Sequence, residues 1–233
     1  MSKKIFFYLA LLSLTAIFSC SKKDNKTVST LAETPIAKAQ YDASNYGIYK
    51  GVFVGSSGTI IIDISNTSAI TATLKIGTTT YNFTTTQTIT LNTASTIAFT
   101  SGSNSFTFSV DASGANPTIT NLIIAGHPEA ILLVVKETST ALVKCFEGTY
   151  SGSDAGTFNA VIYNNIFKAL VKSTTTAGFD ATADGAVVSN VISAGSVSTG
   201  ETFTGTLTGN DFSGTWNNSL SGDNGTWNGT RTY

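Results

Sequence analysis

The sequence contains few charged residues, and the two signs nearly balance. Charged side chains make up 12% of the 233 residues, with 13 Lys and Arg against 14 Asp and Glu. The basic residues form no patch or stripe, and nucleic-acid binding needs one because Lys and Arg must neutralise phosphates. We therefore expect no nucleic-acid partner. Ser, Thr, Gly and Asn are abundant instead, which is typical of β-rich proteins outside the cytoplasm.

Residues that commonly carry catalysis are also scarce. The single histidine, His127, lies in a Gly-His-Pro-Glu stretch typical of a turn, and no Gly-x-Ser-x-Gly nucleophile elbow is present. A catalytic zinc site usually takes several histidines, and no segment matches the Asp-x-Asp-x-Asp-Gly calcium loop. We predict no catalytic residue, no metal site, no cofactor and no enzymatic activity.

Scattered carboxylates leave one catalytic alternative open. Two carboxylates at a suitable separation are enough for glycoside hydrolysis. The sequence alone does not give the distances between carboxyl groups in the folded protein. An undetected hydrolase is therefore an alternative. The candidate acids are Glu129, Glu137, Glu147, Asp154, Glu201 and Asp211.

The N-terminus has the order of a secretory signal. Lys3 and Lys4 precede an apolar stretch over residues 5–18, and the small Ser19 ends it. The stretch is about 14 residues long, whereas a bilayer core needs roughly 20 helical residues. We therefore expect a signal peptide over residues 1–19 rather than a transmembrane helix.

The residues before the first cysteine resemble the lipobox of bacterial lipoproteins. Residues 14–20 read Leu-Thr-Ala-Ile-Phe-Ser-Cys, with Ile17 and Phe18 where the usual lipobox has Leu and a small residue. This looser form is similar to that of lipoproteins from Bacteroidota. The resemblance implies a diacylglycerol on the Cys20 thiol and an acylated amino terminus. Several acyl chains hold a protein stably, because each buried CH₂ contributes about 0.8 kcal/mol. The alternative is an ordinary secreted protein.

The segment after Cys20 is expected to be a tether. Residues 20–40 are polar and show no apolar period, which is typical of a flexible linker. Residues 21–26 read Ser-Lys-Lys-Asp-Asn-Lys and resemble the charged segment that directs some Bacteroidota lipoproteins to the outer face. With Cys20 lipidated, Cys145 has no disulfide partner. Its alternation with Ala141 and Val143 predicts a small buried apolar residue.

Alternation of apolar and polar residues dominates from Tyr46 onward, and no amphipathic helix is evident. This pattern predicts strands with one buried face, while the continuously apolar residues 131–135 predict a strand covered on both faces. Connections are too short for crossover helices, so we expect an all-β antiparallel meander of roughly 12 to 16 strands. The predicted hairpin turns are Asp184-Gly185, Gly209-Asn210 and Asn224-Gly225.

The chain also repeats itself at an offset of about 100 residues. Residues 47–51 read Gly-Ile-Tyr-Lys-Gly and residues 148–152 read Gly-Thr-Tyr-Ser-Gly, and each is followed by Gly-Thr and a strand pattern. We infer two tandem β units, residues 41–138 and 146–233, with chance agreement as the alternative.

An aromatic-x-Gly pattern recurs and predicts strong curvature. Residues two positions apart on a strand lie on the same face, so an aromatic ring can cover a neighbouring glycine. The glycine in turn lets the sheet bend. The sheets should form a barrel, roll or sandwich. The pattern occurs at Tyr49/Gly51, Tyr150/Gly152, Phe203/Gly205, Phe212/Gly214 and Trp227/Gly229.

Four C-terminal aromatics are the candidate ligand-binding residues. Phe212, Trp216, Trp227 and Tyr233 would either form an exposed platform that stacks on sugar rings or pack in a core. Residues 212–220 also resemble the first strand of avidin-like barrels. The rest of that family's motif series is not evident, so the resemblance assigns no ligand residues.

These observations together resemble the small β-rich lipoproteins of Bacteroidota. We expect a protein of the cell envelope, anchored to the outer membrane through Cys20, with a structural or interaction role toward a glycan or a surface protein. The first alternative is a barrel or roll that binds a glycan or a small apolar molecule, and the second is the hydrolase.

Overall fold

The computed structural model describes residues 31–178, 180–196 and 200–233. These residues form sixteen β-strands and one short 3-10 helix, Ala39–Tyr41. Consecutive strands that pair do so antiparallel, which confirms the all-β meander predicted from the alternation. No helix among the described residues is long and apolar enough to cross a membrane.

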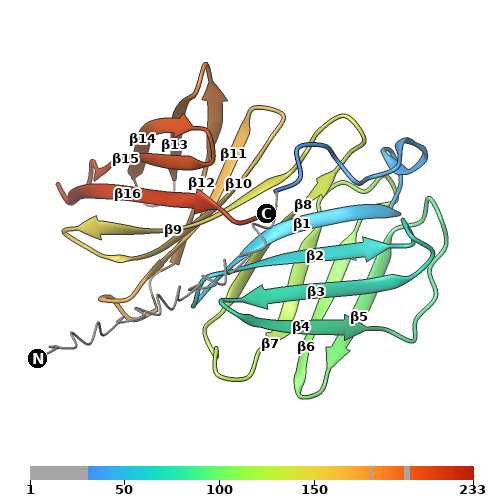
Figure 1. Cartoon of the computed structure of the whole chain (residues 1–233). Coiled ribbons are helices and arrows are strands. Elements are labelled where there is room, and N and C mark those ends of the chain that lie inside the picture. Colours follow the sequence, from blue (N-terminus) through green and yellow to red (C-terminus); the bar gives the residue numbers. More distant parts are fainter. Residues whose placement is uncertain (1–30, 179, 197–199) are drawn as a thin grey trace, which may run out of the picture. The chain divides into compact units, whose positions relative to one another are not determined.

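The first eight strands form one sheet, which we call barrel one (Figure 1). Its order is β7-β6-β5-β4-β3-β2-β1-β8, so β7 and β8 are the two edges and the barrel is nearly closed. We call the gap between these edges the seam. The strands are β1 Gly47–Val54, β2 Gly58–Ile64, β3 Ile70–Ile76, β4 Thr79–Thr84, β5 Ser95–Ser101, β6 Asn104–Val110, β7 Thr118–Ile123 and β8 Ile131–Glu137.

The second eight strands form a closed barrel, which we call barrel two. Each strand pairs with the next, and β16 returns to pair with β9, with Trp227 opposite Tyr150. The strands are β9 Lys144–Gly152, β10 Gly156–Tyr163, β11 Ile166–Ser173, β12 Asp180–Val188, β13 Val191–Ser196, β14 Glu201–Thr208, β15 Asp211–Asn218 and β16 Asn224–Arg231.

The two sheets confirm the prediction of tandem β units. The repeated Gly-x-Tyr-x-Gly segments fall on β1 and β9, which are the first strands of their barrels. The Gly-Thr strands that follow them are β2 and β10. The sequence repeat therefore lies on equivalent strands, as an internal duplication would place it.

The interior of barrel one is filled by aliphatic side chains and Phe. The alternating Ile60, Ile62 and Ile64 of β2 are fully buried, and Phe83, Phe99 and Phe106 pack together with ring centroids 5.0 Å apart in each contact. The inward half of each alternating strand thus supplies the core, which the period-two pattern predicts.

The interior of barrel two is built from aromatic rings over glycines. Trp227 stacks on Phe158 at 5.0 Å between ring centroids, and a Cβ on Gly205 or Gly214 would lie 2.6 to 2.7 Å from the Trp227 ring. A Cβ on Gly229 would likewise meet the Phe212 ring. The covering rings come from other strands, and the aromatic-x-Gly pattern marks where glycines leave room for them.

A third apolar cluster joins the outer face of β1 to the strands of barrel two. It contains Val52, Val143, Cys145, Val161 and Leu170 among its buried members. Cys145 is fully buried, as predicted. Strand β8 contributes to this cluster and to the core of barrel one, so it is covered on both faces as its apolar run predicts.

A buried ion pair lies beside this cluster. Lys50 Nζ and Glu137 Oε2 are 2.5 Å apart with both side chains fully buried. The Glu137 carboxylate also accepts hydrogen bonds from the backbone N–H groups of Ile36 and Val143, at 2.8 and 3.0 Å. Lys50 Nζ lies 4.9 Å from the centroid of the Tyr233 ring. The carboxylate therefore connects the segment before β1, the end of barrel one and the start of barrel two.

Part of the segment predicted as a tether packs against the barrels. The Arg231 side chain pairs with Glu33 at 3.0 Å, and Lys38 N donates to Asn66 Oδ1 at 3.1 Å. Residues 33–38 are thus fixed against the barrels by charge and hydrogen bonds, which a polar composition does not reveal. The predicted signal peptide, Cys20 and the tether as far as residue 30 lie outside the described residues.

Candidate functional site

The two ends of barrel two differ in their connections. At one end β10, β12 and β14 turn into the next strand through two residues, 164–165, 189–190 and 209–210. Asn165 and Asn190 have φ of 63° and 67° in these turns, as short hairpins require. At the opposite end the connections are three to six residues long. We call this the long-loop end.

These turns correct part of the hairpin prediction. Gly209-Asn210 forms the predicted turn. Asp184 and Gly185 instead lie inside β12, and Asn224 and Gly225 begin β16. A two-residue signal cannot separate a turn from a strand in which glycine makes room for a neighbour.

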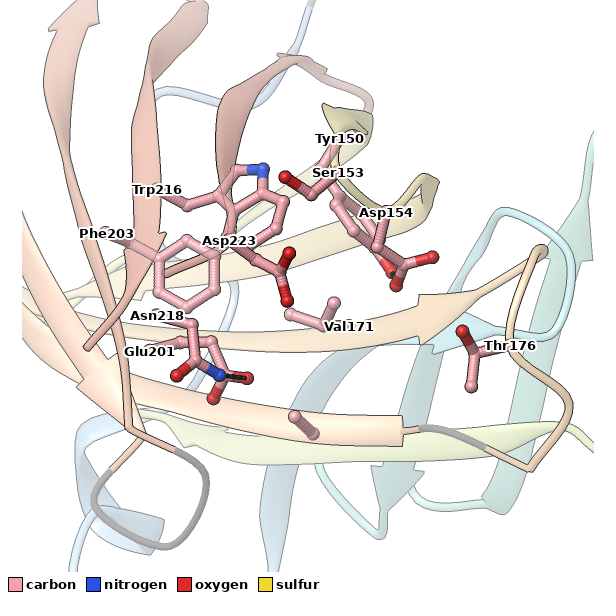
Figure 2. A pocket seen from close by; sticks show the side chains of 11 residues that line it. Tyr150, Ser153, Asp154, Val171, Thr176, Glu201, Phe203, Trp216, Asn218 and Asp223 are labelled. Atoms are coloured by element: carbon pink, nitrogen blue, oxygen red, sulfur yellow. Dashed lines mark hydrogen bonds between the residues drawn. The ribbon is translucent and has the colours of Figure 1, made fainter. Parts of the chain in front are cut away.

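A cavity of about 220 Å³ opens at the long-loop end (Figure 2). Because strands of a meander alternate in direction, every second connection and the adjoining strand ends meet here. The residues that line it are Tyr150, Ser153, Asp154, Val171, Thr176, Ala181, Glu201, Phe203, Trp216, Asn218 and Asp223.

Three aromatic rings form the apolar wall of the cavity. Tyr150, Phe203 and Trp216 come from β9, β14 and β15. The Tyr150 and Trp216 rings meet edge to face, with centroids 5.9 Å apart and planes at 81°. Trp216 Nε1 donates to the Ser151 carbonyl at 3.1 Å. Packing and this hydrogen bond fix the indole ring at the wall before any ligand arrives.

Asp154 is the centre of a hydrogen-bond network on one side of the cavity. The Tyr150 hydroxyl donates to Oδ2 at 2.6 Å, and the hydroxyls of Ser173 and Thr175 donate to Oδ1, the former at 2.9 Å. Partial burial raises the pKa of Asp154, but these hydrogen bonds outweigh it, so the pKa lies below its ordinary value. Burial and the bond to Asp154 raise the pKa of Tyr150. The network therefore holds an ionised carboxylate beside a neutral phenol.

Glu201 and Asn218 form the opposite wall, where Figure 2 shows them side by side. Asn218 Nδ2 donates to Glu201 Oε1 at 3.0 Å, and Glu201 is only 8% exposed. Asn218 Oδ1 accepts the backbone N–H of Leu220 at 2.8 Å. Asp223 lies in the same loop and accepts the Ser221 hydroxyl at 2.6 Å. The described residues of the lining thus carry three carboxyl groups, and none of these residues is Lys, Arg or His.

The four predicted aromatics do not form one exposed platform. Phe212 and Trp227 are 2% and 1% exposed in the interior of barrel two, and Tyr233 packs against the cluster between the barrels. Only Trp216 of the four lines the cavity. The exposed-platform reading is therefore wrong, because alternation turns Phe212 and Trp216 to the inside of a closed barrel. The other cavity aromatics, Tyr150 and Phe203, belong to the aromatic-x-Gly pattern that the sequence displays.

Two of the six candidate acids share the cavity, Asp154 and Glu201. Glu137 is held in the buried ion pair, and Glu129 pairs with Lys172 at 3.2 Å. A general acid in glycoside hydrolysis needs a raised pKa, whereas that of Asp154 is lowered. Asp154 is thus unsuited to donate a proton at neutral pH.

The remaining polar candidates lie elsewhere. His127 Nδ1 and the Ser56 hydroxyl are 2.8 Å apart, between the β1–β2 turn and the loop before β8. In the part of the chain that the structure describes, no carboxylate hydrogen-bonds the other ring nitrogen of His127, so a triad is not assembled there. Burial raises the pKa of the Cys145 thiol to about 12, which suppresses the reactive thiolate. Over the described residues, no three His, Cys, Asp or Glu side chains are grouped to hold a metal ion.

Comparison with known proteins identifies no family. No family model matches the chain, and no curated protein matches it significantly. The functional argument therefore depends on the cavity itself.

Proposed function

We propose that this chain is a binding protein that takes a small organic ligand into the cavity at the long-loop end of barrel two. The observation that carries the proposal is a cavity walled by Tyr150, Phe203 and Trp216 with carboxyl groups at its polar side. Ligand sites are typically concave and apolar with a few placed polar groups, and barrel mouths are common locations for them. An eight-stranded barrel is also the size that can hold one small ligand.

The difference between the two ends of barrel two supports this proposal. The short-turn end is closed by two-residue hairpins, whereas the long-loop end leaves the upper part of the interior open. Below the cavity, the stacked Phe158 and Trp227 fill the barrel. These rings would form a solid floor, so a ligand would enter and leave by the same opening.

We further propose that the protein acts at the cell envelope, held by lipid on Cys20. The support is the signal-like order of residues 1–19 and the lipobox-like residues 14–20. Cells grown with labelled palmitate should yield a labelled mature protein, and Cys20→Ala should abolish both the label and the membrane fractionation. An unlabelled wild-type protein would refute this part of the proposal and leave the cavity argument untouched.

Tryptophan fluorescence tests binding directly, because the only two tryptophans are Trp216 and Trp227. Trp216 lines the cavity and Trp227 lies beneath it. Titration with a panel of monosaccharides, small amines and fatty acids should change the emission of the wild-type protein saturably for at least one class. The same ligand should give a much smaller change in Trp216→Phe. Absence of a saturable response to every class, checked by calorimetry, would refute a binding role.

The hydrolase remains an alternative because Asp154 and Glu201 line the same cavity. Chromogenic glycosides give the test, with Asp154→Asn and Glu201→Gln compared against the wild type. We expect no turnover by any of the three proteins. Turnover that either substitution abolishes would replace binding by catalysis as the function.

A further inference from the structure

We infer that the ligand of the barrel-two cavity is an organic cation, a primary or quaternary ammonium compound. This inference rests on the proposed function and adds the chemical class of the ligand. It combines three properties of the cavity wall: its charge, the direction of its hydrogen bonds and its aromatic surface.

The charge of the wall has one sign. Among the described residues that line the cavity, Asp154, Glu201 and Asp223 are acidic and none is basic. Asp154 is held ionised by the hydrogen bonds that lower its pKa. Glu201 is 8% exposed, so part of this charge lies away from bulk water, where screening is weaker. Anionic ligands are therefore repelled and cationic ligands attracted.

Four hydrogen-bond donors of the described wall residues are engaged within the protein. The Tyr150 hydroxyl donates to Asp154, Trp216 Nε1 to the Ser151 carbonyl, and Asn218 Nδ2 to Glu201. The Ser153 hydroxyl donates to the Asn224 carbonyl at 3.3 Å. The carboxylates of Asp154, Glu201 and Asp223 add acceptor oxygens and negative charge to this wall.

An acceptor-rich wall favours a cationic head that presents no lone pairs. A primary ammonium group has donors and no acceptor, and a quaternary ammonium group has neither, whereas every sugar hydroxyl presents lone pairs that need a donor. A neutral sugar would thus leave part of its hydrogen-bonding capacity unmet in this cavity, which lowers affinity. The direction of the wall's hydrogen bonds therefore favours a cation over the glycan that the aromatic residues alone would suggest.

The aromatic wall suits the same ligand. The faces of Trp, Tyr and Phe attract cations through the ring quadrupole, and aromatic cages are a recurring means of recognising quaternary ammonium groups. Trp216, Tyr150 and Phe203 supply three rings around one cavity. A tetraalkylammonium head would contact these rings while its charge lies near the carboxylates.

A matched pair of probes isolates the charge. Choline and 3,3-dimethyl-1-butanol have nearly the same shape, but only choline is charged. Calorimetric titration of the full chain should give a dissociation constant for choline at least about tenfold lower than that for the alcohol, because a desolvated cation–π contact contributes about this much. The affinity for choline should also fall as salt increases. Glucose is titrated in parallel as the neutral sugar, to test whether the cavity prefers a glycan.

Three carboxyl substitutions locate the effect. Glu201→Gln and Asp223→Asn should each weaken choline binding about tenfold and leave the alcohol unchanged. Asp211→Asn is the matched control, since Asp211 begins β15 at the short-turn end and bonds Thr230 at 2.7 Å. It should bind choline like the wild type. Circular dichroism establishes whether each variant is folded. If Glu201→Gln does not fold, Asp223→Asn and the salt dependence of choline binding test the role of the carboxylates.

The outcomes separate this inference from the proposed function. Binding of the alcohol or glucose as tightly as choline would overturn the cationic ligand and leave a binding site in place. Unchanged choline affinity in both Glu201→Gln and Asp223→Asn would overturn it as well. A failure of all probes, together with the wider fluorescence panel, would overturn the binding role itself.

Discussion

Barrel one and barrel two have the same strand order but solve the packing of their interiors differently. Barrel one is filled by aliphatic side chains and Phe, and its edges β7 and β8 are not joined. Barrel two is closed, uses large rings over glycines, and keeps a cavity at one end. In barrel two, Phe158 and Trp227 stack in the interior, while Tyr150, Phe203 and Trp216 line the cavity wall. The positions of these rings decide where space for a ligand remains.

The largest expected effect concerns the buried ion pair at the junction of the barrels. Lys50→Met leaves the Glu137 carboxylate buried without its cation and should lower the free energy of unfolding by about 3–5 kcal/mol. Lys168→Met is the matched control, because Lys168 and Asp184 form an exposed pair that contributes at most about 1 kcal/mol. Urea titration measures both.

The same titration tests whether the barrels unfold together. Both tryptophans lie in barrel two, so fluorescence reports on that barrel while circular dichroism reports on all strands. We expect coincident transitions in the wild type and separate ones in Lys50→Met. An unfolding free energy of Lys50→Met equal to that of Lys168→Met would mean that the junction contributes little to either barrel.

The sequence predicts the strands and the two β units, but it does not predict barrel closure or the position of the cavity. Alternation and the repeat at residues 47–51 and 148–152 predict strands and two units, because both signals are local. Closure is not local, since it requires β16 to pair with β9, and the pattern was equally consistent with a roll or sandwich. The site depends on height along the barrel: Phe212 and Trp216 share an inward face, but only Trp216 reaches the mouth. A period-two pattern gives the face and not the depth.

The second largest effect should appear in amide exchange across the seam. Strand β7 pairs only with β6, through an irregular register between Ser105 and Thr107, whereas its counterpart β15 pairs on both sides. Local opening governs exchange, so the amides of β7 should be protected at least about 100-fold less than those of β15, roughly 2.7 kcal/mol. Equal protection of the two strands would show that β7 and β8 are joined in solution and that both barrels are closed.

A smaller effect should follow from filling the glycine space in barrel two. A Cβ at Gly214 would lie 2.7 Å from the Trp227 ring and closer still to the Thr204 carbonyl, so Gly214→Ala should cost about 1–3 kcal/mol through overpacking. Gly195→Ala in the same barrel has its nearest neighbour at 3.0 Å and the next at 4.0 Å. Its unfolding free energy should lie closer to that of the wild type. If the two variants were equally stable, the ring-over-glycine account of the barrel-two interior would fail.

The smallest expected effect tests the hydrogen-bond network at the mouth of barrel two. Asp154→Asn removes the charge that accepts three hydroxyl donors and should destabilise the protein by about 1 kcal/mol at pH 7. The pKa of Asp154 is lower in the folded protein than its ordinary value, so its contribution is complete above the unfolded value of about 3.9 and is lost as the pH falls through the folded value. Urea midpoints of wild type and variant should therefore differ at pH 7 and converge in acid. If the two urea midpoints still differed by the same amount at pH 2, the amide would destabilise the protein through its shape or hydrogen bonding rather than through the lost charge. The ionised carboxylate would then no longer explain how the cavity wall is held.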